Sequence, residues 1–107
     1  MLSQYVGAMN IPVWTLATNR GQYCLRETKE SPEGPVLFTS AEAAERFMGL
    51  HSDLWGPLLG AHVLSVPGTL QSSLDLWRQK KGKEALVYID ARPSLGGFGD
   101  FDAEYAQ

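Results

Sequence analysis

Two histidines and an aspartate come nearest to a metal site in this chain of 107 residues. His51 and Asp53 stand two positions apart, and His62 follows His51 by eleven. Three such ligands can hold zinc and leave one coordination position open for chemistry. The spacing matches no defined zinc signature, and His51 falls on the apolar stripe of an expected helix. We therefore expect a structural histidine at position 51 and no metal site.

The single cysteine, Cys24, is a second candidate for chemistry, because a cation beside a thiol lowers its pKa and makes it nucleophilic. The expected strand register places Cys24 beside Arg26 on an outward face. A redox-responsive thiol is one hypothesis for this residue. A small, partly buried strand residue is the more common role of cysteine, and we favour it. One cysteine also excludes an internal disulfide and a zinc site built from cysteines.

The remaining catalytic motifs are incomplete. No serine lies in a Gly-x-Ser-x-Gly turn, and the glycine-rich residues 96–99 lack the Lys-Ser/Thr pair and the following helix of a phosphate-binding loop. We predict no catalytic residue, no metal and no cofactor. The alternative is a small-molecule-binding or enzymatic domain with a site at the C-terminal ends of its strands, where ligands gather in open α/β sheets. Its candidate polar residues are Thr39, Ser40, His51, Asp53 and Asp90.

Composition and charge narrow the class of protein. Hydrophobic residues make up 44% and charged residues 20%, which is typical of one globular domain. Twelve acidic against nine basic residues give a net charge of −3, the opposite of the usual balance in a nucleic-acid-binding module. No stretch approaches the ~20 apolar residues of a membrane span, and no signal peptide is recognisable. We expect a cytoplasmic protein without a nucleic-acid or membrane partner.

Large apolar residues stand in a segment expected to connect two elements, at residues 51–60. Leu54, Trp55 and Leu58 belong to it, together with a Gly-Pro pair. Because loops usually lie on the surface, these side chains either fold back as a lid on the core or form an exposed patch. The sequence leaves both interpretations open.

The C-terminal tail, residues 93–107, mixes glycine and acidic residues with the aromatic Phe98 and Phe101. Either it packs along its own sheet, or it engages another chain by adding a strand to an edge. Its acidic residues can face a basic group formed by Arg78, Lys80, Lys81 and Lys83. An acidic partner is one explanation of that group; a solvated helix end, where cations suit the negative end of the helix dipole, is the one we favour.

The pattern of apolar and turn residues predicts the regular elements. Residues 1–11 favour a short helix, and residues 13–18 and 20–28 a β-hairpin. An even loop would place Leu16 and Tyr23 on one face, with Trp14 and Leu25 beside them. Further strands are expected at residues 36–38, 61–66 and, centrally, 85–89.

Two helices are expected between these strands. Thr39 and Glu42 have the spacing of a capping box, which predicts that the first helix begins after Thr39. Its apolar stripe runs to His51. Thr69 can cap a second helix that ends at Gly82. The order predicts an α+β domain: a mixed sheet of about five strands, an N-terminal antiparallel hairpin followed by β-α-β-α-β, with two helices packed on it.

Residues 12–92 resemble the SseB N-terminal-like domains of bacteria. The resemblance is carried by Pro-Val-Leu-Phe-Thr-Ser-Ala-Glu-Ala-Ala at residues 35–44, which matches a family strand "V-x-F-T-S" running into a helix "x-E-x-A-x-x-F". It implies a small cytoplasmic α+β domain without an established catalytic constellation, so it supplies no site residues.

The function expected from these observations is a non-catalytic protein-interaction or self-associating module. It rests on the absence of a catalytic constellation beside the apolar connection and the aromatic tail. The expected partner is a protein, with a second copy of this chain as the simplest version. The candidate interaction residues are Leu54, Trp55, Leu58, Phe98, Phe101, Arg78, Lys80 and Lys81.

Overall fold

The described part of the chain forms one mixed sheet with two helices. A computed structural model describes residues 10–82, 85–94 and 100–106. The predicted α+β class is confirmed, and the described residues form seven strands where about five were expected. The second hairpin strand is split in two, and the tail adds another. In chain order the elements are β1 (Val13–Thr18), β2 (Gly21–Gln22), β3 (Cys24–Leu25), β4 (Gly34–Phe38), α1 (Ala41–Trp55), β5 (His62–Val66), α2 (Leu70–Lys81), β6 (Val87–Pro93) and β7 (Phe101–Ala106).

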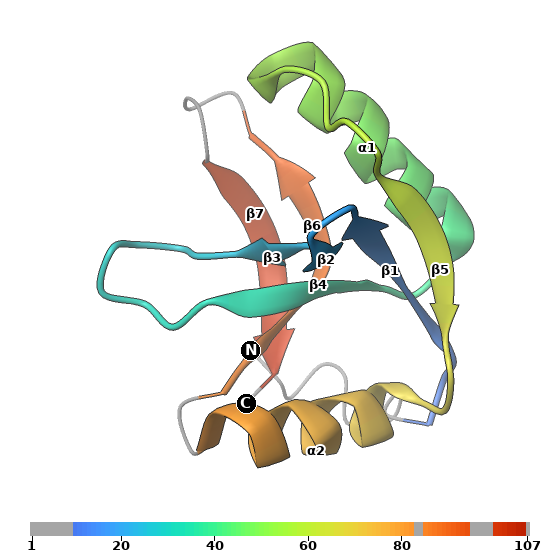
Figure 1. The fold of residues 1–107 in the computed structure, drawn as a ribbon, viewed down its shortest axis with the longest axis vertical. Helices are drawn as coiled ribbons and strands as arrows, with labels where there is room; N and C mark the ends of the chain where they lie inside the picture. The colour runs from blue at the N-terminus through green and yellow to red at the C-terminus, as the bar shows by residue number, and fades with distance from the viewer. Residues whose placement is uncertain (1–9, 83–84, 95–99, 107) are drawn as a thin grey trace.

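The sheet is centred on a parallel pair, β4 and β6. On one side of this pair, β1 runs antiparallel to β4 and β5 antiparallel to β1; on the other side, β7 runs antiparallel to β6. The chain passes from β4 to β6 through α1, β5 and α2 (Figure 1). Parallel strands need such a long crossover, because a tight turn can join only antiparallel neighbours.

The N-terminal hairpin has the predicted even register. The backbone N–H of Tyr23 donates to the carbonyl of Leu16 at 2.8 Å, so the two residues face each other. Trp14 and Leu25 share the same face, as expected, because both belong to the cluster around Phe38 and Phe47. They are not direct partners, since Trp14 pairs with Phe38. After Tyr23 the chain leaves β1, and β3 pairs with β4.

Alternate residues of β4 build two separate cores. Val36 and Phe38 pack in one cluster with Phe47 of α1, and Leu37 packs in the other with Leu74 of α2. Since side chains of a strand alternate between faces, α1 covers one face of the sheet and α2 the other. All five residues of β4 are buried, as expected of a strand covered on both faces.

The first helix begins and ends one residue or more later than predicted. Its N-cap is Ser40, whose hydroxyl accepts from the backbone N–H of Ala43 at 3.1 Å. The predicted capping box at Thr39 is wrong, because the Thr39 hydroxyl bonds elsewhere in the fold. The helix continues past His51 to Trp55, so half of the expected connection is helical.

The second helix is built as predicted. The hydroxyl of Thr69 accepts from the backbone N–H of Ser72, and the hydroxyl of Ser72 accepts from the backbone N–H of Thr69. Gly82 ends the helix with φ +82°, a backbone conformation that favours glycine. The strand expected at residues 85–89 begins later, at Val87, and extends to Pro93; it lies between β4 and β7.

The C-terminal tail packs along its own sheet as β7, beside β6. The ring of Phe101 meets that of Tyr88 edge-on at 5.1 Å between centroids. Of the helix predicted within residues 1–11, only positions 10 and 11 belong to the described residues. Phe98 lies outside the described residues as well. In the described part of the chain, no helix is long and apolar enough to cross a membrane.

Candidate functional site

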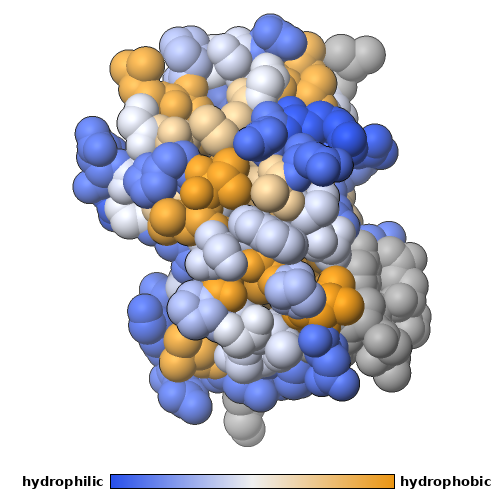
Figure 2. Space-filling model, turned by 90° about the vertical axis from the view of Figure 1, so that its right-hand side faces the viewer, coloured by the Kyte–Doolittle hydropathy of each residue, from blue (hydrophilic) through white to orange (hydrophobic). Residues whose placement is uncertain are grey.

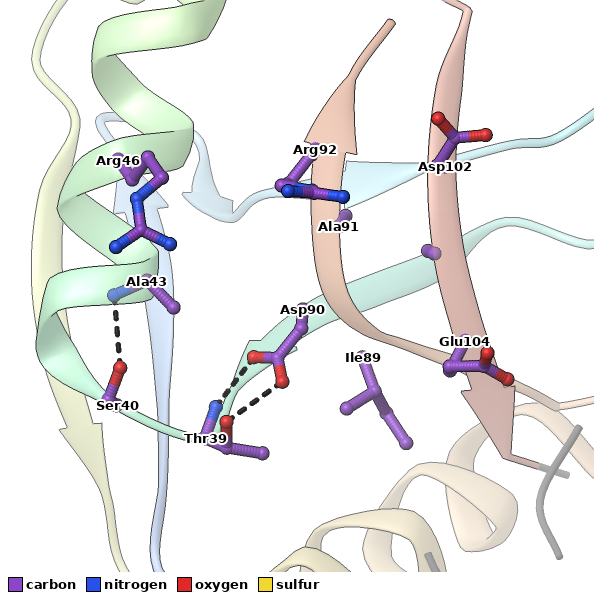
Figure 3. Close-up of a pocket in the computed structure, with 11 residues that line it drawn as sticks. Thr39, Ser40, Ala43, Arg46, Ile89, Asp90, Ala91, Arg92, Asp102 and Glu104 are labelled. Atoms are coloured by element: carbon purple, nitrogen blue, oxygen red, sulfur yellow. Dashed lines mark hydrogen bonds between the residues drawn. The ribbon is translucent and has the colours of Figure 1, made fainter. Parts of the chain in front are cut away.

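A cleft of about 620 Å³ opens at the carboxyl ends of the parallel strands β4 and β6 (Figure 3). The β4–α1 junction forms one wall, β6 the middle and β7 the other wall. The chain leaves β4 toward α1, whereas the neighbouring strand β6 is reached from the other face of the sheet. Ligands of open α/β sheets bind in the crevice outside the carboxyl ends of the strands. The polar residues that line the cleft are Thr39, Ser40, Arg46, Asp90, Arg92, Asp102 and Glu104.

Asp90 ties the two parallel strands together at the base of the cleft. Its Oδ1 accepts from the backbone N–H of Thr39 at 2.8 Å, and its Oδ2 accepts from the Thr39 hydroxyl at 2.8 Å. Hydrogen bonds to a charged acceptor are stronger than those between neutral groups. The carboxylate therefore fixes the point where β4 ends and α1 begins.

Asp90 also has an uncommon backbone. Its φ is +52°, and no other non-glycine residue in the described part of the chain has a positive φ. Aspartate adopts this left-handed region more readily than most residues, yet the conformation still costs about 1 kcal/mol. Such backbone strain gathers at functional sites, where the surrounding contacts hold it in place.

A β-bulge surrounds Asp90 and sets the direction of Arg92. Ile89 pairs with Glu104 and Arg92 pairs with Asp102, so β6 uses one residue more than β7 over this step. With regular alternation, Arg92 would face away from Ile89. The extra residue turns Arg92 to the same side as its cross-strand neighbour Asp102.

Charge is arranged unevenly across the cleft. Arg46 projects from α1 and Arg92 from β6, whereas Asp102 and Glu104 belong to β7 (Figure 3). Neither arginine side chain forms an ion pair or hydrogen bond with a described residue. Arginine presents a planar fork of donors that matches carboxylate and phosphate oxygens. The cleft thus offers donors for an anionic group beside a wall of carboxylates.

The hydroxyls of the cleft are engaged in holding the backbone. Thr39 donates to Asp90, and Ser40 caps α1. Asp90 in turn holds the Thr39 backbone N–H, so the carboxylate positions the junction. This arrangement suits binding of a ligand and provides no assembled nucleophile and general base.

Three of the five polar residues proposed from the sequence for a strand-end site come together in the cleft: Thr39, Ser40 and Asp90. His51 and Asp53 do not line it, because they lie near the other end of α1. The remaining polar residues of the cleft, which include Arg46 and the acidic residues of β7, were not singled out. The alternation of apolar and acidic residues from Phe101 to Tyr105 is the signal that could have predicted this strand and its acidic face.

His51 has a structural role. It is 8% exposed, and its Nδ1 donates to the backbone carbonyl of Gly56 at 2.8 Å. Its ring packs edge-on against Tyr23 and Trp55, with centroids 5.9 and 5.1 Å away. His62 is exposed on β5. In the part of the chain that the structure describes, no three potential metal ligands lie together.

The Cys24 thiol is half-buried, and its pKa is raised to about 11. Burial is the main cause, and Glu33, as a charge and a hydrogen-bond partner, adds to it; Lys81 opposes the rise. Arg26, which was expected to lower this pKa, instead faces Glu33 at 3.9 Å. The electrostatics around Cys24 therefore give no support to the hypothesis of a redox-responsive thiol, and the thiol fits the favoured interpretation of a partly buried strand residue.

The apolar connection mostly folds back onto the core. Trp55 and Leu58 are partly buried and pack against the cluster that contains Phe38 and Phe47, here called the α1-side cluster. The ring of Trp55 meets Phe47 edge-on at 6.3 Å. Leu54 remains 38% exposed, and Leu59 is 81% exposed. Trp55 and Leu58 therefore fold back onto the core as the lid interpretation expects, whereas Leu54 and Leu59 are exposed.

The other candidate interaction residues lie on β7 and α2. Phe101 packs against the α1-side cluster. Arg78 lies 3.7 Å from Asp75 of the same helix, and the ammonium of Lys81 lies 5.5 Å from the ring centroid of Trp77. Lys80 is exposed at the last position but one of the helix. The basic group is thus a solvated helix end in this structure.

Comparison with known proteins found no matching family model, no similar curated protein and no similar solved structure. The resemblance to SseB N-terminal-like domains therefore stays a prediction.

Proposed function

We propose that this protein is a small-molecule-binding domain whose ligand occupies the cleft at the ends of β4 and β6. The ligand carries a carboxylate or phosphate group that Arg46 and Arg92 bind. The observation that carries this proposal is the pair of arginines projecting from different elements into one cleft, with no ion pair to a described residue.

Two further features support a site here. The volume of about 620 Å³ falls within the ~300–1,000 Å³ of ligand pockets. The strained backbone of Asp90 and the bulge around it direct Arg92 toward the cleft, at the expense of regular strand pairing. Bulges that re-aim a side chain recur next to binding sites.

The test is a titration of the ¹⁵N-labelled full chain with inorganic phosphate and with acetate, followed by ¹H–¹⁵N correlation spectra. We expect chemical-shift changes confined to residues 39–46, 89–92 and 102–104. Arg46→Gln and Arg92→Gln should each weaken binding, by about threefold to fivefold for an exposed charge pair.

The matched control is Arg78→Gln, which removes an exposed arginine from α2, outside the cleft. It should leave the titration unchanged. Shifts centred on residues 78–81, or titrations that Arg46→Gln and Arg92→Gln leave unaltered, would contradict the proposal.

A self-associating module is the second candidate, favoured by the surface around β5. Among the described strands, β5 pairs only with β1, and it contains no lysine, arginine or acidic residue to discourage edge pairing. Three exposed leucines belong to α1, the following connection and β5: Leu54, Leu59 and Leu64. Figure 2 shows the apolar surface on this side as separate patches between polar ones, which favours a weak contact.

Sedimentation velocity over a range of protein concentrations tests this second candidate. Association through the β5 edge should be abolished by Leu64→Lys, which places a charge on the exposed strand. The control is Leu76→Lys on α2, a leucine of similar exposure. A monomer at every concentration would contradict self-association and leave the ligand-binding proposal untouched.

A further inference from the structure

The geometry points to a zwitterionic ligand in this cleft, a small molecule that carries an ammonium group as well as a carboxylate. This inference rests on the proposed ligand-binding function and specifies its chemistry. It follows from the positions of the charges on the two walls.

The positive and negative groups occupy different elements. Arg46 lies on α1, Arg92 lies in the middle on β6, and Asp102 lies on β7 beyond Arg92 (Figure 3). Asp102 is exposed and forms no ion pair with a described residue. A ligand that reaches from the arginines to β7 therefore meets an opposite charge at each end.

An anion without a positive group would fit this cleft less well. Asp102 lies on the same side of the sheet as Arg92 and directly opposite it in the strand pairing. A carboxylate bound by Arg92 is thus held close to a second carboxylate, and like charges repel at this range. An ammonium group on the ligand converts that repulsion into attraction.

The size of the cleft permits a ligand that spans both walls. At ~30 Å³ for each molecule of liquid water, 620 Å³ corresponds to about twenty waters. A single carboxylate fills a small part of this space. A molecule of amino-acid or dipeptide size can place its two charged groups at separate points in it.

Matched probes test the inference. The full chain is titrated with γ-aminobutyrate and ε-aminocaproate, and in parallel with butyrate and caproate, which lack only the ammonium group. Two chain lengths allow for the separation of the walls. At least one zwitterion should bind about fivefold more tightly than its matched anion, the upper range for one exposed charge pair.

Charge changes at Asp102 locate the ammonium site. Asp102→Asn should remove the advantage of the zwitterion, and Asp102→Lys should strengthen butyrate binding while weakening that of γ-aminobutyrate. Opposite effects on two probes cannot come from a damaged fold. Asp75→Asn, an acidic residue of α2 that does not line the cleft, is the control and should change neither titration.

The outcomes separate the two proposals. Equal binding of zwitterions and matched anions, unaffected by Asp102→Asn, overturns the zwitterion inference and leaves an anion-binding cleft. Failure of every probe, with phosphate and acetate also inert, overturns the ligand-binding function and the inference with it.

Discussion

Thr39 and Asp90 are 51 positions apart in the chain, yet two hydrogen bonds of 2.8 Å join them. The backbone N–H of Thr39 donates one bond and its hydroxyl donates the other, so the carboxylate fixes both the backbone position and the side-chain rotamer of Thr39. Through this contact β6 determines where β4 ends and where α1 starts. The contact also forms the base of the proposed binding cleft.

Substitutions at Asp90 should separate its hydrogen bonds from its backbone strain. Asp90→Ala removes both bonds and keeps a side chain at φ +52°, so we expect a loss of about 2 kcal/mol in the free energy of unfolding. Asp90→Gly loses the same bonds and relieves the strain, so it should be about 1 kcal/mol more stable than Asp90→Ala. Urea denaturation measures both. Equal stabilities would contradict the role of strain.

The Thr39 hydroxyl should be energetically coupled to Asp90. In a double-mutant cycle of Thr39→Val and Asp90→Ala, we expect a coupling free energy of about 1 kcal/mol, because the two side chains share one bond. Thr69→Val is the matched control: it removes the N-cap of α2 at a cost of about 1 kcal/mol, and its effect should add to that of Asp90→Ala. Coupling of equal size in both cycles would argue against a direct interaction.

Gly34 and Gly49 should respond oppositely to alanine. A Cβ at Gly34 would lie 2.5 Å from the backbone carbonyl oxygen of Leu86, so β4 and the segment that leads into β6 must move apart. Gly34→Ala should therefore lose about 2 kcal/mol or more in the free energy of unfolding. A Cβ at Gly49 meets nothing within 4 Å inside α1, and alanine should add up to ~1 kcal/mol through its helix propensity. Thermal or urea unfolding tests the pair. A stable Gly34→Ala variant would mean that β4 does not approach residue 86 this closely.

The Cys24 thiol should react slowly at mildly alkaline pH. With its pKa raised to about 11 by burial and by Glu33, little thiolate exists near pH 8.5, and alkylation by iodoacetamide should be at least about tenfold slower than in the urea-unfolded chain. The rate should rise with pH toward a midpoint near 11. Glu33→Gln should move that midpoint down. A folded-state midpoint at the ordinary value would contradict the environment described for Cys24.

The same pKa shift predicts a loss of stability in alkali. The unfolded chain releases the Cys24 proton near pH 8.5, whereas the folded chain keeps it until about 11, so the stabilisation is complete below pH ~8.5 and is lost as the pH rises through 11. Burial likewise raises the pKa of Tyr23 to about 12 and extends the loss upward. Urea titrations from pH 8 to 11 measure the slope, which Cys24→Ser should reduce.

Local patterns in the sequence were sufficient for most of the elements. The continuous apolar run at residues 36–38 predicted a strand that is buried on both faces, and β4 is buried in this way. Thr69 and Gly82 predicted the ends of α2 because caps satisfy backbone groups within one turn. The even hairpin register followed from alternating side chains alone.

Only the tertiary structure decided which residues meet at the cleft. Thr39 has the local features of a helix cap, yet a carboxylate from another strand takes its hydroxyl, and Ser40 caps the helix instead. Arg92 and Asp102 become neighbours because a bulge in β6 sets their register with β7. Such contacts depend on strand order and long-range pairing. Such contacts cannot be predicted from residues that are close in the sequence. Helix caps, turns and alternation are formed by residues that are close in the sequence, so they can be predicted from it.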